Sequence, residues 1–220
     1  MQTFKTSKGK ENILSRIRKE LNDASTSIPF PEAEKSGAPL YAWPIEDMEE
    51  TFVSAFAKLG GKFVFCENEL ELMQNILLLK ESRGWDDMLC ADPRLLKLFQ
   101  NNKINEIIAA DARLESAEVC ITGCELLVAR TGSIMVSSRL NLGRMSSVYF
   151  PVHIVFAYAN QIVADIDDAF VAMRKKYGTD LPSMLNLTTG PSRTADIEKT
   201  LVVGVHGPAE IFCFYINADL

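Results

Sequence analysis

The stretch MEETFVSAFAKLGGKFVFC, residues 48–66, decides the fold class. Its apolar residues recur at helical spacing, which predicts a helix with one apolar face over residues 48–59. Gly60-Gly61 then ends the helix, because glycine readily adopts the backbone conformation that follows a last helical turn. Lys62-Phe-Val-Phe-Cys66 is a short apolar run that fits a buried strand. A helix therefore leads directly into a strand.

The same alternation of helices and strands continues along the chain. The spacing predicts helices over residues 69–82, 93–101 and 164–176, and strands over residues 86–91, 118–122, 133–137, 153–158 and 211–216. Alternation with short linkers is typical of an α/β fold, in which helices cover both faces of a mostly parallel sheet. Ligands of such open sheets gather at the carboxyl ends of the strands.

The N-terminal region precedes this alternation. Residues 8–23 carry apolar side chains at helical spacing and charged residues elsewhere, which predicts an amphipathic helix. Residues 28–44 contain four prolines, a composition that sustains neither a helix nor a central strand and indicates an extended connector. We therefore expect an N-terminal helix and connector over residues 1–44 and one α/β domain over residues 45–220.

The composition narrows the class of protein. The 220 residues are 47% hydrophobic and 24% charged, which is typical of a globular chain. The chain has 29 acidic and 23 basic residues, which gives a net charge of -6. Because a negative net charge repels polyanions, we expect no nucleic-acid partner. No stretch resembles the core of a signal peptide or approaches the roughly 18 apolar residues of a membrane span. We expect a cytoplasmic protein without a membrane span.

The cysteines indicate a reducing compartment. They are odd in number and irregularly placed, at Cys66, Cys90, Cys120, Cys124 and Cys213, which suits reduced core thiols better than a disulfide framework. No four of them cluster as the ligands of an iron–sulfur centre do, and no spacing resembles a zinc site. The glycine patterns of nucleotide-binding loops do not occur. The sequence therefore predicts neither a cofactor nor a metal.

The most informative stretch for function is MLNLTTGPSRTADIE, residues 184–198. A strand-like run breaks at Gly190-Pro191 and restarts with helix-compatible residues. A glycine turn before a helix presents free N–H groups and a positive dipole end, which favour an anion. Arg193 adds a guanidinium that suits a carboxylate or phosphate, while Ser192 and Thr194 could cap the helix or bind the ligand. The alternative is a capped helix start with a solvated arginine.

A second stretch with glycine and proline, VGVHGP at residues 203–208, follows closely. His206 lies here, and imidazole is the side chain most easily poised as an acid or base near neutral pH. The alternative is a turn histidine that bonds a backbone carbonyl. Clustering favours a functional interpretation if folding brings the two turns together, because the set could then recognise an anion and move a proton. The set is Ser192, Arg193, Asp196, Glu198 and His206.

A third candidate is ARTGSIM, residues 129–135, where Thr131-Gly132 could let a strand pass close to a ligand. The other histidine, His153, flanks an apolar strand and is interpreted as a core or rim residue rather than a catalyst. The two histidines thus fall in different segments of the chain.

Gly190-Pro-Ser-Arg-Thr-Ala-Asp-Ile-Glu198 followed by Gly204-Val-His-Gly-Pro208 resembles the signature of the LUD domain, the LutC/YkgG family. The motif is long and specific, and the similarity extends over most of the chain after about Ile45. The resemblance implies a three-layer α/β/α fold of the NagB/RpiA/CoA-transferase type, whose other members bind sugar phosphates, CoA or folates. It also implies a role in growth on L-lactate beside partner proteins that carry iron–sulfur clusters. This chain resembles the small subunit without clusters.

One departure from the family pattern affects the expected site. Many members have Ala-Glu-Thr-Gly where this chain has Ala129-Arg130-Thr131-Gly132, so a cation replaces a carboxylate. This argues against a mechanism that relies on that glutamate and strengthens anion binding, with Arg130 and Arg193 beside one negative group. We expect catalytic roles for His206 and Glu198. The expected ligand-binding residues are Gly190, Ser192, Arg193, Thr194, Asp196, Thr131, Gly132 and Arg130.

Three functions from different classes remain open at this point. The first is a cluster-free small subunit or accessory protein of an L-lactate utilization system, in which lactate is oxidised to pyruvate, with a small anionic metabolite as its ligand and iron–sulfur subunits as partners. The second is a stand-alone enzyme of the CoA-transferase or phosphosugar-isomerase kind, with His206 or Glu198 as base and Arg193 on a phosphate. The third is a metabolite-sensing module. The fold alone does not choose among them.

Overall fold

The computed structural model describes residues 8–23, 44–110, 117–140, 147–197 and 200–219. The chain divides into two compact units, residues 1–44 and residues 45–220. In the first unit, α1 (Lys8–Asp23) is the helix predicted from the apolar spacing. Within the described ranges, no helix is long and apolar enough to cross a membrane.

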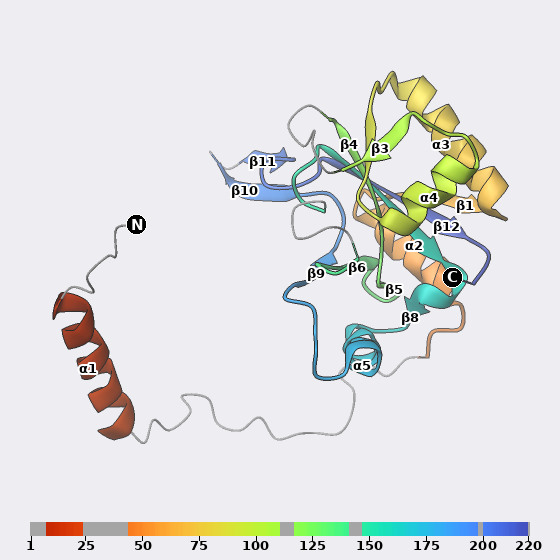
Figure 1. Cartoon of the computed structure of the whole chain (residues 1–220). Helices are drawn as coiled ribbons and strands as arrows, with labels where there is room; N and C mark the ends of the chain where they lie inside the picture. Colours follow the sequence, from red (N-terminus) through yellow and green to blue (C-terminus); the bar gives the residue numbers. More distant parts are fainter. Residues whose placement is uncertain (1–7, 24–43, 111–116, 141–146, 198–199, 220) are drawn as a thin grey trace. The chain divides into compact units, whose positions relative to one another are not determined.

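The second unit is built on a six-stranded sheet in which all neighbouring strands are parallel (Figure 1). The central strands are buried almost throughout, and strands buried on both faces form continuous apolar runs that sequence analysis recognises. The predicted α/β class with a mostly parallel sheet is confirmed. Across the sheet the order is β1 (Lys62–Cys66), β12 (Glu210–Ile216), β7 (Val152–Tyr158), β4 (Val119–Gly123), β2 (Met88–Cys90) and β3 (Ile107–Ala109).

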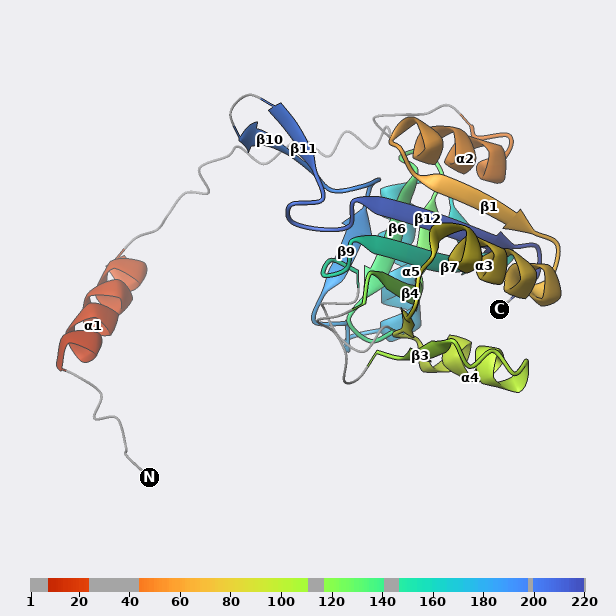
Figure 2. The same ribbon diagram turned by 90° about the horizontal axis from the view of Figure 1, so that it is seen from above.

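Two helices cover one face of this sheet (Figure 2). They are α3 (Glu69–Arg83) and α4 (Pro93–Asn101), which share an apolar cluster with β4, β7 and β12. Each helix begins at a side chain that accepts a backbone N–H, Asn68 for α3 and Asp92 for α4. Pro93 follows Asp92 at the first helical position, where its missing N–H costs nothing.

The opposite face is shared by α2 (Met48–Lys58) and a second sheet. We expected only helices on this face, although residues 133–137, which form β6 of the second sheet, were predicted as a strand. The reason for the difference is that β5 and β8 have three and two residues, too few for a strand period to be recognised. The four strands of the second sheet are, in order, β8 (Ile162–Val163), β5 (Leu126–Val128), β6 (Ser133–Ser137) and β9 (Leu185–Thr188). A single 3-10 turn, η1 (Ala159–Gln161), leads from β7 into β8.

The last helix, α5 (Ile166–Tyr177), packs on the outer face of the second sheet. Its C-terminal end is fixed by the buried carboxylate of Glu125, which accepts hydrogen bonds from Lys176 Nζ at 2.7 Å and the Tyr177 hydroxyl at 2.6 Å. Burial and the bond to Glu125 raise the pKa of Tyr177 to about 12. The second sheet is thereby held between α5 and the central sheet.

The residues after Gly190-Pro191 form a β-hairpin, so the helix predicted there is wrong. β10 (Arg193–Ile197) pairs antiparallel with β11 (Thr200–Val203). The hairpin is rich in threonine, isoleucine and valine, whose branched side chains lose freedom in a helix and favour a strand. Ser192 and Thr194 therefore cap no helix, and an anion site cannot depend on a helix dipole at this point.

Gly132 brings the turn between β5 and β6 against the backbone of α2. Its φ is +60°, and a Cβ added there would lie 2.4 Å from the backbone nitrogen of Phe56 and 2.7 Å from the carbonyl carbon of Ala55. The turn would have to move away from α2 to admit a side chain. The close approach expected of Thr131-Gly132 is therefore made to a helix.

We expect Gly132→Ala to lower the free energy of unfolding by about 3 kcal/mol or more, because a left-handed alanine costs about 1–2 kcal/mol and the clash adds to it. Gly84→Ala is the matched control, since Gly84 has a φ of +66° but nothing lies within 4 Å of an added Cβ. Urea unfolding measures both losses. Equal losses in the two variants would contradict the tight contact with α2.

Candidate functional site

The two motif turns near the end of the chain lie side by side. The backbone N–H of Ser192 donates to the carbonyl of Pro208 at 2.8 Å, and the N–H of Gly204 donates to the carbonyl of Ser192 at 3.0 Å. A Cβ added at Gly207 would lie 3.0 Å from Ser192 Cβ. The base of the hairpin thus joins the segments that sequence analysis singled out separately.

Arg193 leaves this junction and reaches the C-terminal end of α2. Its Nη2 donates to the carbonyl of Leu59 at 2.6 Å, and a cation at that end of a helix complements the helix dipole. Gly190 packs on the same residue, because a Cβ added at Gly190 would lie 2.9 Å from Leu59 Cβ. Gly190 to Arg193 therefore docks on the last turn of α2.

The Thr131-Gly132 turn arrives at the same helix end from another direction. A chain of hydroxyls connects it to Thr189, the residue after β9, with 2.8 Å from Thr131 Oγ1 to Ser133 Oγ and 2.8 Å from Ser133 Oγ to Thr189 Oγ1. Arg130 pairs with Asp165, whose Oδ2 accepts from Arg130 Nε at 2.7 Å at the start of α5. The guanidinium of Arg130 is thus held by α5, whereas that of Arg193 is held by α2.

A groove of about 600 Å³ lies beside the end of α2. It carries two cations, Lys58 and Arg130, and one carboxylate, Glu50, together with hydroxyl groups that donate hydrogen bonds. Ammonium, guanidinium and hydroxyl donors of this kind can bind a small anion, although Arg130 already pairs with Asp165. The groove is lined by Glu50, Thr51, Ser54, Ala55, Lys58, Leu59, Arg130 and Thr131.

The structure describes only some of the remaining residues of the predicted site. His206 is exposed and follows Gly204 in the turn that meets Ser192. Asp196 lies in β10. Glu198 lies outside the residues that the structure describes. Proton transfer by His206 or Glu198 therefore stays a prediction.

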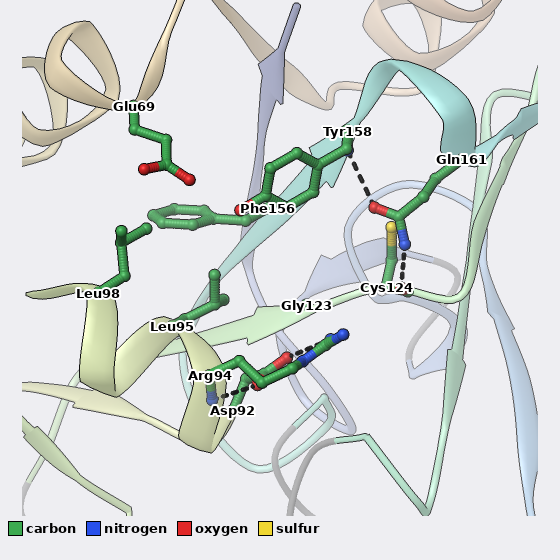
Figure 3. A pocket seen from close by; sticks show the side chains of 10 residues that line it. All are labelled: Glu69, Asp92, Arg94, Leu95, Leu98, Gly123, Cys124, Phe156, Tyr158 and Gln161. Carbon is green, nitrogen blue, oxygen red and sulfur yellow. Dashed lines mark hydrogen bonds and ion pairs between the residues drawn. The ribbon is translucent and has the colours of Figure 1, made fainter. Parts of the chain in front are cut away.

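A second, smaller cavity of about 130 Å³ lies on the other side of the central sheet, at the carboxyl ends of β2, β4 and β7 (Figure 3). From β2 the chain passes through α4 to β3 on one side, whereas after β4 it returns to the central sheet at β7 on the other side. Open sheets bind ligands where the strand order reverses in this way. The lining residues are Glu69, Asp92, Arg94, Leu95, Leu98, Gly123, Cys124, Phe156, Tyr158 and Gln161.

A buried carboxylate organises one wall of this cavity. Asp92 is 1% exposed, and its two oxygens accept from the backbone N–H of Arg94 at 2.9 Å, from Arg94 Nε at 3.3 Å and from Arg94 Nη2 at 2.9 Å. The bond to Asp92 raises the pKa of Arg94. Gly123 makes room for the pair, because a Cβ there would lie 2.7 Å from Asp92 Oδ2. The guanidinium is therefore fixed in one orientation.

The opposite wall contributes a phenol and a second carboxylate. Burial and the nearby charge of Glu69 raise the pKa of Tyr158, so its hydroxyl stays protonated at neutral pH and can donate. Gln161 is held by the backbone, since it accepts from the N–H of Tyr158 at 2.9 Å and donates to the carbonyl of Cys124 at 2.7 Å. Figure 3 shows Glu69 and Arg94 on opposite sides, with Leu95 and Leu98 between them.

This cavity was not predicted from the sequence, although two features of the sequence indicate it. Asp92-Pro93 directly follows a predicted strand, and Gly123-Cys124 directly follows another. The rule that ligands gather at the carboxyl ends of parallel strands applies to both places. Neither position carries a recognisable motif, so the rule was the only guide.

The remaining histidine and the cysteines belong to the core. His153 is buried, and its Nε2 lies 2.7 Å from Thr122 Oγ1, which confirms its interpretation as a core residue. All five cysteines are free and buried, and burial raises the pKa of each thiol. Within the described ranges, no group of three or more histidine, cysteine, aspartate or glutamate side chains could hold a metal ion.

The fold and its cavities define an α/β protein with an open parallel sheet. A cavity of the size of a small ligand lies at the point where the order of the strands reverses. Residues 49–216 match the LUD domain family, and the chain belongs to that family. A crystal structure of a DUF162 family protein from Deinococcus radiodurans has the same fold, with a TM-score of 0.57 at 18% identity over 77% of this chain and 96% of that one.

Curated relatives carry the name lactate utilization protein C. The protein from Bacillus subtilis is 37% identical over 100 residues, which cover 44% of this chain and 42% of the relative. The protein from Geobacillus sp. is 33% identical over 137 residues, which cover 56% of this chain and 57% of the relative. The chain thus spans about half the length of the curated relatives that it matches.

Burial of His153 predicts a dependence of stability on acid. Burial lowers its pKa to about 4 from the usual 6.5, so His153 takes up a proton at a higher pH in the unfolded chain than in the folded chain. The contribution of neutral His153 to the free energy of unfolding is fully present above about pH 6.5. It is lost as the pH falls toward 4, and the loss is roughly 3 kcal/mol at most. The ring protons of His153, followed by NMR, should titrate well below pH 6.5. A midpoint at 6.5 or above would contradict its burial as a neutral ring.

Proposed function

We propose that this chain is a cytoplasmic, cluster-free small subunit or accessory protein of an L-lactate utilization system, and that it binds a small anionic metabolite in the groove beside α2. The observation that carries the proposal is that the turns at Thr131 and Gly190 both dock on the end of α2, next to the cations of that groove. The name shared by the curated relatives supports the metabolic role.

The groove supplies the charges that a carboxylate requires. Lys58 and Arg130 line it, and Arg193 stands at the same helix end with one of its five N–H donors committed to Leu59. A charge-assisted hydrogen bond contributes about 1.5–3 kcal/mol when water is partly excluded. Two such bonds, about 3–6 kcal/mol together, are enough to hold a small hydroxy acid or keto acid at concentrations from several millimolar down to tens of micromolar.

The redox part of lactate oxidation would belong to partner proteins. Conversion of lactate to pyruvate releases two electrons and two protons, which an acceptor must take up. The cysteines of this chain are buried core thiols with raised pKa values, so they are poor ligands for an electron-carrying cluster. We therefore assign this chain binding and assembly, and its partners electron transfer.

A thermal-shift and calorimetric titration with L-lactate and pyruvate tests the groove. We expect both ligands to stabilise the chain, and Arg193→Ala or Lys58→Ala to weaken binding about 10-fold, the loss of one charge-assisted bond. Lys97→Ala is the matched control, because Lys97 is an exposed lysine of α4 that lines neither cavity. Unchanged affinity in both the Lys58 variant, which alters the groove lining, and the Arg193 variant, which alters the adjoining helix end, would place the anion elsewhere.

The assembly role is tested separately by affinity purification from cells grown on L-lactate. We expect iron–sulfur proteins to co-purify with the tagged chain, and the purified chain alone to show no turnover. Unaided turnover of a CoA ester or a sugar phosphate would overturn the proposal in favour of a stand-alone enzyme. Ligand binding together with the failure of any iron–sulfur protein to co-purify would favour a sensing module.

A further inference from the structure

We propose that the small cavity at the carboxyl ends of β2, β4 and β7 is a second ligand site, which takes a short carboxylic acid with a hydroxyl or ammonium group at C2. This site is separate from the groove of the proposed function, since the two cavities have no lining residue in common. They also lie against opposite faces of the central sheet, with α3 and α4 on one and α2 on the other.

The carboxylate of such a ligand fits Arg94. Asp92 occupies Nε and Nη2 of this guanidinium, and no other described residue bonds Nη1, so donors remain for a second anion. The Arg94 side chain is 52% exposed although its partner is 1% exposed, which puts the guanidinium between the interior and the opening of the cavity. A buried carboxylate that fixes an accessible guanidinium is a built recognition element, because the orientation is set before the ligand arrives.

The substituent at C2 fits Glu69 and Tyr158. Glu69 forms no ion pair with any residue in the described part of the chain, so its carboxylate can accept from an ammonium or hydroxyl group. The Tyr158 hydroxyl lies in the same wall and serves as a donor or an acceptor. A ligand with a negative end and a donor group beside it matches the two ends of the cavity.

The apolar part of the ligand fits the surface between these groups. Leu95, Leu98 and Phe156 form it, and Phe156 is also fixed by packing against Phe99. A volume of about 130 Å³ admits a molecule of a few carbon atoms and is too small to enclose a nucleotide or CoA. The cavity therefore selects a short side chain, such as the methyl group of alanine or lactate.

Binding is tested by titrating the whole chain with L-alanine and L-lactate, followed by amide chemical shifts and calorimetry. Propionate is the matched ligand without a donor at C2. We expect the amides of Gly123 and Cys124 to shift, and one of the two C2-substituted acids to bind at least 10-fold more tightly than propionate, the effect of a charge-assisted bond. Alanine and lactate as separate arms identify the substituent as ammonium or hydroxyl.

Two variants locate the ligand within the cavity, and two others serve as controls. We expect Glu69→Gln and Tyr158→Phe each to weaken binding about 10-fold while the chain stays folded, because both changes conserve shape. Glu81→Gln is the control, since Glu81 is an exposed glutamate at the other end of α3. Arg193→Ala should leave this affinity unchanged, so loss of the groove site and loss of this site are told apart.

Two results would overturn the inference. One is the absence of amide shifts at Gly123 and Cys124 with any of the acids up to about 10 mM, which means that the cavity holds only water. The other is binding of propionate as tight as that of the C2-substituted acids, together with unchanged affinity in the Glu69 and Tyr158 variants.

Discussion

The close approach of three chain segments to the last turn of α2 is the constraint on which the domain depends. A Cβ added at Gly61 would lie 2.4 Å from the ring of Phe56, and one at Gly132 would lie 2.4 Å from the backbone nitrogen of the same residue. Gly190 packs on Leu59 a turn later. Because none of these contacts leaves room for a side chain, the start of β1 and the turns before β6 and β10 are fixed by one helix end.

Much of this arrangement was accessible from sequence because the elements concerned show a helical period or a continuous apolar run. The apolar run of residues 62–66 and the periodic helix before it match β1 and α2, although β1 lies at the edge of the sheet and only Cys66 of it is fully buried. The failures are of two kinds. β5 and β8 are too short to show a period, and the residues after Pro191 suit a helix until their pairing partner, which includes Val202 and Val203, is taken into account. In those cases the pairing between strands determined the secondary structure, and the local propensity of the residues did not.

The same distinction between local sequence signals and tertiary contacts applies to the candidate sites. Gly190, Ser192 and Gly207 were singled out because glycine and proline mark turns, and these turns do meet, through Ser192 and Pro208. The cavity around Asp92 escaped notice because its walls come from α3, α4 and three strands far apart in the chain. No local pattern joins Glu69 to Tyr158. Only the order of the strands brings them together, and that order is a property of the whole sheet.

The burial of every cysteine gives the protein an internal set of reporters. A thiol reacts as a thiolate, and here each thiol is both shielded from solvent and held protonated by its apolar surroundings. Electrophiles in solution can therefore modify Cys66, Cys90, Cys120 or Cys213 only after the strands around them separate. The rate of alkylation at neutral pH thus measures how often each part of the sheet opens.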